Sequence, residues 1–240
     1  MSLPVQTPST TLRVGITGGT SGLGLALVRA FVERGDRVAF VARTAEAVAA
    51  VAAETGAVGI VGDVARKDDI HRIALQVTAA LGGLDVLINN ASDLGPVPLA
   101  LLADTDCEDF ERALQTNLLG SFRLSKALLG ALAGSAREQR GGVIVNISSD
   151  AAVAPYETWG AYGASKAALH HLSHIWDAEL AGEGVRVLSL DPGDMDTPMH
   201  ALAVPDSDPA TLKRPETAAR EAADAIAETL AQYALTGAAR

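Results

Sequence analysis

The segment AYGASKAAL, residues 161–169, places a tyrosine four residues before a lysine in a run of small residues. On a helix, residues i and i+4 lie on one face about one turn apart, so Tyr162 and Lys166 would project together. An ammonium beside a phenol favours the phenolate and lowers the pKa of the tyrosine from its ordinary value of about 10. Such a tyrosine can act as a general acid or base near neutral pH. The pair alone is a common chance pattern, so its meaning depends on the rest of the chain.

A second candidate is the pair of serines that ends the apolar run GGVIVNISS, residues 141–149. A serine hydroxyl can orient a carbonyl oxygen and stabilise negative charge that builds on it during a reaction. Successive residues of a strand point to opposite faces, so only one of Ser148 and Ser149 would face a cleft. The other serine is expected to make a structural hydrogen bond.

A glycine-rich turn, ITGGTSGLG at residues 16–24, lies between the first apolar run and an apolar helical pattern. Glycines permit a tight turn and let backbone N–H groups approach a pyrophosphate at a helix N-terminus. The turn does not fit G-x-G-x-x-G, but it fits Thr-Gly-x-x-x-Gly-x-Gly. It therefore predicts a dinucleotide-binding loop whose contacts come from Thr17, Gly18, Thr20, Ser21, Gly22, Leu23 and Gly24.

The end of the second strand indicates which dinucleotide is preferred. An NAD enzyme places an acid there to bond the ribose 2′-hydroxyl, but this chain has Ala42 and then Arg43. Arg43 could hold a 2′-phosphate with charge-assisted bonds, and Thr44 could add a hydroxyl. Ser21 is neutral where a second basic group would help. We expect NADP(H), with NAD(H) as the alternative if Arg43 is only a solvated loop residue.

These residues need elements to position them, and the chain alternates short apolar runs with helical patterns. Strands are expected at 12–17, 37–42, 57–63, 84–89, 141–149 and 185–190, and helices at 21–35, 44–54, 67–81, 107–133, 160–180 and 215–231. Near-continuous apolar strands that alternate with helices predict an α/β fold, a parallel sheet covered by helices on both faces.

The chain is expected to form one catalytic domain over residues 12–240, after a polar leader at 1–11. The long irregular stretch is 192–215, rich in proline, and long loops of this kind often cover a binding site. Only QYALTGAAR follows the last helix, so a seventh strand would be short or missing. We expect six strands and leave a seventh open.

Composition excludes several classes of function. The 240 residues carry a formal net charge of -10 and no dense basic run, which argues against nucleic-acid binding. No apolar run approaches the roughly 20 residues of a membrane span, so we expect no membrane partner. The single cysteine, Cys107, precludes an intrachain disulfide and suits a reducing cytoplasm, where we expect the protein.

Several motifs in order now resemble the short-chain dehydrogenase/reductase family, over about residues 12–230. TGGTSGLG resembles its cofactor loop, and NNAS at 89–92 resembles the motif after its fourth strand, with Ser92 where glycine is more usual. YGASK supplies the tyrosine and lysine, and Ser149, thirteen residues earlier, matches the catalytic serine. The remaining positions that match family motifs are Asp63, Val64, Asn90, Ala91, Asn117, Pro192, Gly193 and Thr197.

The resemblance implies a Rossmann-like doubly wound fold and an oxidoreductase that interconverts a carbonyl and an alcohol. Tyr162 would be the proton donor, Ser149 would bind the carbonyl oxygen, and Lys166 would tune the tyrosine and hold the cofactor ribose. Asn117 would bind a water that links Lys166 to solvent. Asp63 and Val64 would hold the adenine, and Asn90 and Ala91 would also line the cofactor site. Pro192, Gly193 and Thr197 would lie at the nicotinamide.

The substrate is a small molecule that the sequence does not identify. Pocket candidates lie between Ser149 and Tyr162 and in the long loop: Asp150, Glu157, Trp159, Asp194, Met199 and His200. Acids and an indole would suit a polar or cationic group. His170 and His174 have a metal-compatible spacing, but without a matching ligand set a helix interface is favoured and no metal is expected.

Two other functions compete with this interpretation. A catalytically silent NADP-binding regulator on the same fold would be expected to lack Tyr162 or Lys166, but both are present. An epimerase or dehydratase of the longer branch of the family would need C-terminal elements for which the chain has little room. For assembly, we expect a homodimer in which helices 107–133 and 160–180 pair across a twofold axis. A tetramer is the alternative, weakened by the short C-terminus.

Overall fold

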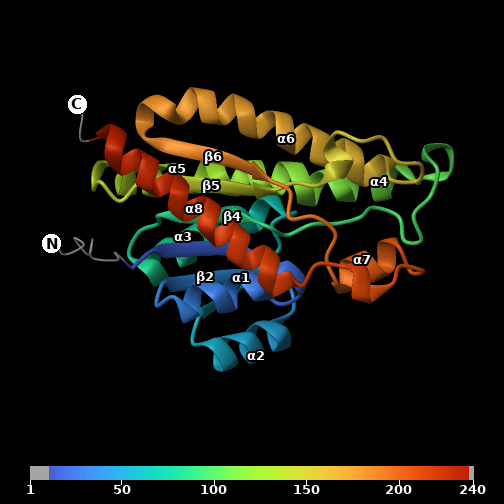
Figure 1. Ribbon diagram of the computed structural model, residues 1–240, viewed down its shortest axis with the longest axis horizontal. Coiled ribbons are helices and arrows are strands. Elements are labelled where there is room, and N and C mark those ends of the chain that lie inside the picture. Colours follow the sequence, from blue (N-terminus) through green and yellow to red (C-terminus); the bar gives the residue numbers. More distant parts are fainter. Residues whose placement is uncertain (1–10, 238–240) are drawn as a thin grey trace, which may run out of the picture.

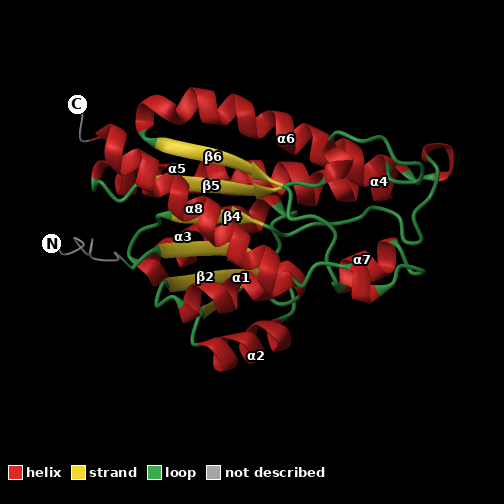
Figure 2. Ribbon diagram, viewed as in Figure 1, coloured by secondary structure: helices red, strands yellow, loops and turns green. Residues whose placement is uncertain are grey.

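The computed structural model describes residues 11–237, with side chains for residues 11–232. Six parallel strands form one sheet in the order β3-β2-β1-β4-β5-β6 (Figures 1 and 2). The strands are β1 (Arg13–Thr17), β2 (Arg37–Ala42), β3 (Val58–Val61), β4 (Val86–Asn89), β5 (Gly142–Ile147) and β6 (Val185–Leu190). The order reverses between β1 and β4, and ligands of open α/β sheets bind beyond the carboxyl ends of the strands at such a point.

Helices cover both faces of the sheet, as the alternating pattern predicts (Figure 1). One face carries α1 (Gly22–Glu33), α2 (Ala45–Thr55) and α8 (Pro215–Gly237). The other carries α3 (Lys67–Leu81), α5 (Ser121–Arg137) and α6 (Gly160–Leu180), with α4 (Cys107–Leu114) packed against α6. The fold is therefore a Rossmann-like doubly wound α/β sheet.

The sheet is buried on both faces because alternate side chains of each strand enter different cores. On β4, Val86 and Ile88 pack with α1 and α8, whereas Leu87 packs with α3 and α5. All three side chains are at most 1% exposed. Burial on both faces explains why the strands read as continuous apolar runs rather than as an alternation of apolar and polar residues.

The predicted helix over 107–133 is interrupted by a π-helical turn. Residues Gln115–Gly120 form this turn between α4 and α5, and the helical stretch continues to Arg137. A Cβ on Gly120 would lie 2.8 Å from the carbonyl oxygen of Val64, so a glycine permits this close approach. The turn carries Asn117 with its side chain fully buried.

The prolines of segment 192–215 predict an irregular loop, but the segment is partly helical. It contains the short helix α7 (Pro198–Ala203) and a 3-10 turn at Pro209–Thr211. Pro198 occupies the first turn of α7, where its missing N–H costs no hydrogen bond, and the Thr197 hydroxyl accepts the N–H of His200. Proline therefore begins structure here rather than preventing it.

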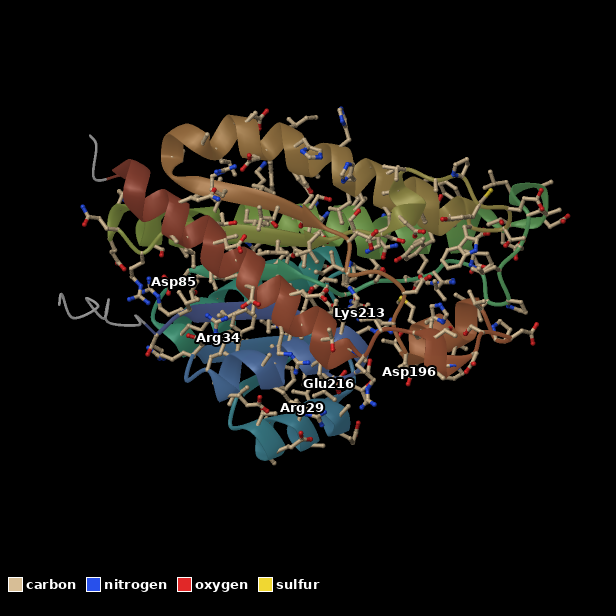
Figure 3. The ribbon with its side chains drawn as sticks, viewed as in Figure 1. Arg29, Arg34, Asp85, Asp196, Lys213 and Glu216 are labelled. Atoms are coloured by element: carbon tan, nitrogen blue, oxygen red, sulfur yellow. The ribbon has the colours of Figure 1, made fainter. Side chains whose placement is uncertain are left out.

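Backbone hydrogen bonds close the base of this segment. Lys213 donates its N–H to the carbonyl of Asp194 and accepts the N–H of Asp196, both at 3.0 Å. Figure 3 shows Asp196 beside α7 and Lys213 near the start of α8. The Lys213 ammonium also pairs with Glu221 at 2.7 Å. The two ends of the stretch that carries α7 are therefore held to each other, and the later end is also tied to α8.

Two expectations concern the ends of the chain. After β6 the described residues form no further strand, and α8 continues to Gly237, so QYALTG extends the last helix. The predicted leader 1–11 lies outside the described residues except for Thr11. Within residues 11–237, no helix is both long and apolar enough to span a membrane.

Candidate active site

The glycine loop and the NNAS motif meet at the carboxyl ends of β1 and β4. The Thr17 hydroxyl accepts the backbone N–H groups of Asn90 and Ala91, both at 3.0 Å. The Asn90 amide donates to the carbonyl oxygen of Thr17 at 2.9 Å. Thr17 is 3% exposed and lies outside the cavity described below, so it holds the two loops together rather than touching a ligand.

Glycine is required at two positions of this loop. Gly18 has φ +72, which L side chains rarely adopt. A Cβ on Gly24 would lie 2.0 Å from the carbonyl oxygen of Gly18 and 2.5 Å from the Asn90 amide nitrogen. The loop therefore turns tightly enough to bring the first turn of α1 under the ends of β1 and β4.

The N-terminus of α1 is open toward the site. Ser21 is the N-cap residue, but its side chain makes no capping hydrogen bond, and the first turn contains no acid. The first N–H groups of a helix lack intrahelical acceptors and carry a positive partial charge. Ser21, Gly22, Leu23 and Gly24 all line the cavity, so this end of α1 suits an anionic group such as a pyrophosphate.

One continuous cavity of about 730 Å³ joins this loop to the Tyr162 region. Its far wall comes from the segment after β6, where a Cβ on Gly22 would lie 3.2 Å from the Thr197 methyl carbon. The expected cofactor residues that line it are Gly18, Thr20, Ser21, Gly22, Leu23, Gly24, Arg43, Thr44, Asp63, Val64, Asn90, Ala91, Tyr162, Lys166, Pro192, Gly193 and Thr197. The elongated set fits a dinucleotide, because it runs from the ends of β2 and β3 past α1 to α6.

Tyr162 lies on α6 at the inner end of the cavity. Its side chain is 8% exposed and packs against Leu94 and Ala151, with Met199 and Ala203 of α7 over the same cluster. Burial raises the pKa of Tyr162 to about 12, although hydrogen bonds with Ser149 and Ser92 act to lower it. Our expectation that Lys166 lowers this pKa is wrong for this geometry.

The reason lies in where the Lys166 ammonium points. Its Nζ donates to the carbonyl oxygen of Ile147 at 2.7 Å and lies 5.4 Å from the centre of the Tyr162 ring. The side chain is 2% exposed, and burial lowers the pKa of Lys166 to about 8. The sequence places both residues on one face of α6 correctly, but the ammonium is held by the end of β5 rather than by the phenol oxygen.

Asn117 is a structural anchor of the loop after β4. Its Nδ2 donates to the carbonyl of Asp93 and to Ser165 Oγ, both at 2.8 Å. Its Oδ1 accepts the N–H of Asp93 at 2.7 Å and the hydroxyl of Ser92 at 3.1 Å. These bonds use both amide donors and both acceptor positions, and the residue does not line the cavity.

Both serines after β5 line the cavity, whereas we expect only one of them to face a cleft, but their surroundings differ. Ser149 accepts the N–H of Ala151 at 3.2 Å, donates to Asp150 Oδ1 at 3.0 Å and hydrogen-bonds Tyr162. Ser148 is 4% exposed, and its Oγ has no hydrogen-bond partner among the described residues. The thirteen-residue spacing therefore selects the serine that meets the tyrosine, whereas the structural hydrogen bond expected for the Ser148 side chain is absent.

A buried polar chain beneath these residues could not be recognised from sequence. Asn89 donates to Ser125 Oγ at 2.9 Å and to Asn146 Oδ1 at 2.8 Å, and Asn146 donates to Ser173 Oγ at 2.9 Å. The chain of hydrogen bonds runs along one face of the sheet, from α5 over β4 and β5 to α6. The register pairs Asn89 with Asn146, which only the strand order reveals.

Most of the residues expected to form the substrate pocket line the cavity. Asp150, Trp159, Asp194, Met199 and His200 line it, whereas Glu157 is exposed and does not. Glu157 falls in an exposed turn, away from the wall formed by Trp159. Tyr156 was missed: its hydroxyl donates to Asp150 Oδ2 at 2.7 Å, and its ring lies 6.4 Å from that of Trp159.

The histidines of α6 form a local pair rather than a metal centre. His174 Nε2 lies 3.2 Å from His170 Nε2, and His170 Nδ1 lies 2.8 Å from Ser189 Oγ. Within the described part of the chain, no group of three or more His, Cys, Asp or Glu residues is arranged to hold a metal ion.

Comparison with known proteins gives a consistent result. The sequence profile described as short chain dehydrogenase matches residues 13–208. The chain is 33% identical over 190 residues to 2-(R)-hydroxypropyl-CoM dehydrogenase of Xanthobacter autotrophicus, covering 77% of this chain and 74% of that protein.

Two solved structures illustrate the likeness in fold. A 3-ketoacyl-(acyl-carrier-protein) reductase from Brucella melitensis complexed with NADH has a TM-score of 0.82 at 26% identity, covering 88% of each chain. A short chain dehydrogenase from Escherichia coli CFT073 complexed with NADPH has a TM-score of 0.77 at 27% identity, covering 85% of each chain. Both cofactors therefore occur among the structural neighbours.

Proposed function

The chain belongs to the short-chain dehydrogenase/reductase family of oxidoreductases, which act on alcohol or carbonyl groups, and we propose that it transfers hydride between NADP(H) and a carbonyl/alcohol substrate with Tyr162 as general acid/base. The observation that carries the proposal is that Tyr162 and Ser149 stand in the same cavity as the glycine loop. A dinucleotide that fills this cavity would place its nicotinamide end beside the two hydroxyls.

The residues present fit such a cofactor. The open N-terminus of α1 would receive the pyrophosphate, Asp63 and Val64 the adenine, and Lys166 the nicotinamide ribose. Pro192, Gly193 and Thr197 would form the wall behind the nicotinamide. When bound, the nicotinamide supplies the hydride chemistry, and the protein supplies orientation and the proton.

The chain's own residues would act on the substrate oxygen. Ser149 would donate a hydrogen bond to that oxygen and stabilise its developing negative charge. Tyr162 would give it the phenolic proton from Oη in reduction and take a proton from the alcohol in oxidation. Because its pKa is about 12, Tyr162 holds its proton at neutral pH and is ready to act as the acid.

Lys166 and Asn117 would act at one remove. The Lys166 ammonium is held by the Ile147 carbonyl and does not lower the pKa of Tyr162, so we assign it to binding the nicotinamide ribose. The Asn117 side chain is used fully within the protein, so we assign it to positioning the Ser92–Asp93 loop beside Tyr162. A water relay to Lys166 would need an acceptor or donor other than this amide.

The preference for NADP(H) rests on charge at the end of β2. Arg43 is exposed there and lines the cavity, and no acid occupies that position to repel a 2′-phosphate. Support from relatives is divided, since neighbours have been solved with NADH and with NADPH. NAD(H) is therefore the competing cofactor in the test below.

For the substrate we propose a small carbonyl or alcohol compound with a polar or cationic group. Asp150 lies next to Ser149, and its hydrogen bond from Tyr156, with that from Ser149, holds the pKa of Asp150 below its usual range despite partial burial. Trp159 and Tyr162 meet edge to face with ring centres 5.6 Å apart. Carboxylates beside aromatic faces favour a cation over an anion.

The rival function, a silent NADP-binding regulator, gains no support from the comparisons. It gives no reason for Tyr162, Ser149 and Lys166 to be together in one cavity.

We also propose that the protein is a cytoplasmic homodimer. The single cysteine, Cys107, favours a reducing compartment such as the cytoplasm. The long helices α5 and α6 offer the surface through which two copies would pair.

The test is oxidation of NADPH against a diverse carbonyl panel, with NADH in parallel and Tyr162→Phe as the matched variant. We expect turnover of one compound class with NADPH and a loss of at least about 100-fold in the variant, because the proton donor is gone. NADPH binding to the variant, followed by fluorescence, should be retained. Binding without turnover of any compound would favour the regulator, and faster turnover with NADH would contradict the role of Arg43.

A further inference from the structure

A second hollow of about 400 Å³ adjoins the cavity at the ends of β2 and β3. Its lining contains three arginines and two acids together with two small or apolar residues: Arg43, Val61, Gly62, Asp63, Arg66, Asp69 and Arg72. In a chain of net charge -10, arginines that outnumber acids around one hollow mark a place that favours an anion.

Two of the charged residues, Arg72 and Asp69, form an ion pair and neutralise each other. Arg72 pairs with Asp69 at 3.1 Å and donates to the carbonyl of Val61 at 2.9 Å. Asp69 also accepts the N–H of Asp63 at 2.9 Å. These bonds fix the start of α3 against the end of β3, and they leave neither Arg72 nor Asp69 free for a ligand.

Among the described residues, the other two arginines have no bonded partner, although the charge of Arg66 helps to lower the pKa of Asp69. The side chains of Arg43 and Arg66 are exposed and make no hydrogen bond or ion pair within the described part of the chain. An arginine without a partner can offer its planar fork to a phosphate without first breaking an ion pair. Both side chains line the same hollow and are available to bind an anion there.

Backbone geometry holds the two arginines at neighbouring strand ends. The N–H of Gly62, after β3, donates to the carbonyl of Ala42 at the end of β2 at 2.9 Å. The N–H of Arg66 then donates to the carbonyl of Asp63 at 3.1 Å, in the turn that begins α3. Arg43 follows Ala42 directly, so the turn at Asp63–Arg66 brings the second arginine to the hollow that the first one lines.

We propose that Arg66 is the second basic residue of a subsite for the 2′-phosphate of NADP(H), acting with Arg43 across this hollow. The inference rests on the proposed function, because it takes the adenosine ribose to lie at the ends of β2 and β3. It supplies the positive group that Ser21 in the glycine loop does not provide. Arg66 would be a specificity-determining residue that favours NADP(H) over NAD(H) without touching the reacting atoms.

The experiment is equilibrium binding, by calorimetry, of NADPH, NADH, adenosine 2′,5′-bisphosphate and adenosine 5′-monophosphate. We expect Arg66→Gln to weaken NADPH and the bisphosphate by about tenfold, because charge-assisted hydrogen bonds to the phosphate are lost. NADH and the monophosphate should change by less than about twofold. Arg66→Lys keeps the charge but loses the fork, so it should give an intermediate loss.

Lys67→Gln is the matched control. It removes the same unit of charge one residue further along, from an exposed side chain that does not line the hollow. We expect this variant to bind NADPH like the unaltered protein. An equal loss in Lys67→Gln would overturn the proposal, because the effect would then come from net charge alone.

The outcomes also separate this inference from the proposed function. If Arg43→Gln loses NADPH affinity and Arg66→Gln does not, the role of Arg66 is wrong and the NADP(H) proposal stands. If the unaltered protein binds NADH more tightly than NADPH, the cofactor preference fails, and Arg66 with it. A selective loss in both arginine variants, weaker at high salt because ions screen exposed charges, supports both.

Discussion

Tyr162 is surrounded by apolar atoms and hydroxyl groups, and these surroundings favour the neutral phenol over the phenolate. Burial penalises the phenolate, and the carboxylates of Asp191 and Asp150 add to the penalty. The Lys166 ammonium, 5.4 Å from the centre of the ring, donates its hydrogen bond to the carbonyl of Ile147 instead. The residue is therefore held in the acid form, which matches a role in giving a proton to a carbonyl oxygen.

The first prediction concerns the ionisation of this phenol. Because the pKa is raised to about 12, the ultraviolet difference titration between the unaltered protein and Tyr162→Phe should show one tyrosine that ionises well above pH 10. The unfolded chain ionises first, so the contribution of Tyr162 to stability is full below about pH 10 and is lost as pH rises toward 12. An ionisation below pH 9 would instead support control by Lys166.

The second prediction separates the two adjacent serines. Ser149→Ala should lower kcat/KM by about 100-fold or more, because the hydroxyl that stabilises the developing charge is removed. Ser148→Ala is the matched control: it removes a buried hydroxyl that has no partner within residues 11–232, so its effect on kcat/KM should stay within about threefold. Steady-state kinetics of both variants with one substrate measures these changes in kcat/KM. Equal losses in the two variants would contradict the assignment of Ser149 as the serine that binds the substrate oxygen.

At this scale the sequence predicted residue types and faces better than it predicted contacts. Spacing and motif order correctly brought Tyr162, Lys166 and Ser149 to one end of the cavity. The direction of the Lys166 ammonium depends on the carbonyl of Ile147, nineteen residues away on another element. Thr17 lies in the right loop but turns toward the N–H groups of Asn90 and Ala91. These hydrogen-bond partners are distant in the sequence and meet only in the folded protein, so residue spacing does not predict them.

At the scale of elements, one buried carboxylate ties the starts of several strands together. Asp85, just before β4, is fully buried and receives Arg13 at 2.7 Å from the start of β1 and Arg140 at 2.7 Å from the loop before β5. Ser135 near the end of α5 donates to it at 2.5 Å. Figure 3 shows Asp85 toward the left of the view, apart from Lys213 and Asp196, and Asp85 does not line the cavity, so this cluster serves stability rather than the site.

The third prediction follows from this cluster. Burial alone would raise the pKa of Asp85, but hydrogen bonds from Arg140, Arg13 and Ser135 outweigh it and lower the pKa to about 2. Asp85→Asn should reduce the free energy of unfolding by about 3 kcal/mol, because two arginines lose a buried partner. Chemical denaturation at pH 7 measures this. Glu138→Gln, which removes an exposed partner of Arg13, should cost under about 1 kcal/mol.

The same carboxylate sets a pH window. Its folded pKa lies below the unfolded value, so its contribution is present above about pH 4 and is lost as pH falls toward 2. The gap in unfolding free energy between the unaltered protein and Asp85→Asn should therefore narrow between pH 4 and 2. A gap that does not change over this range would show that the arginines do not depend on the carboxylate charge.

Element boundaries show what periodicity can and cannot reveal. The helices over 67–81 and 160–180 and the strands over 37–42 and 185–190 have the predicted bounds. The π-helical turn at Gln115–Gly120 keeps the helical pattern of apolar residues, so the sequence showed one continuous helix. In 192–215, five prolines suggested a loop, yet Thr197 and Pro198 are good helix-start residues and α7 begins there. The prediction of a loop gave the proline content of the whole segment more weight than the helix-start signal at Thr197 and Pro198.

At the scale of the whole molecule, the class of fold was readable and the strand order was not. Alternation of apolar strands with helices requires a parallel sheet with two covered faces, and the structure has one. The reversal between β1 and β4, which creates the cleft, depends on which face each crossover takes. The family resemblance implied a doubly wound sheet without giving the strand order, and periodicity alone would have allowed other orders.

The fourth prediction concerns assembly. The Phe122 ring on α5 lies 5.2 Å from the Trp176 ring on α6, so the two helices adjoin, and Ile175 beside Trp176 is 43% exposed. If α5 and α6 pair with their copies across a twofold axis, this apolar residue is covered in the dimer. Light scattering should then give twice the chain mass, and Ile175→Asp should shift the protein toward the monomer by placing a charge in the interface.

Leu75→Asp provides the comparison, because Leu75 is 70% exposed on α3, which covers the same face of the sheet but lies outside the proposed interface. The same change there should leave the dimer intact. Dissociation in both variants would indicate that added negative charge, in a chain already at -10, opposes association wherever it is placed. Dissociation in Ile175→Asp alone, with cofactor binding retained, locates the twofold axis along the helix that carries Tyr162 and Lys166. The catalytic helix would then be stabilised by its own copy, which links assembly to the geometry of the site.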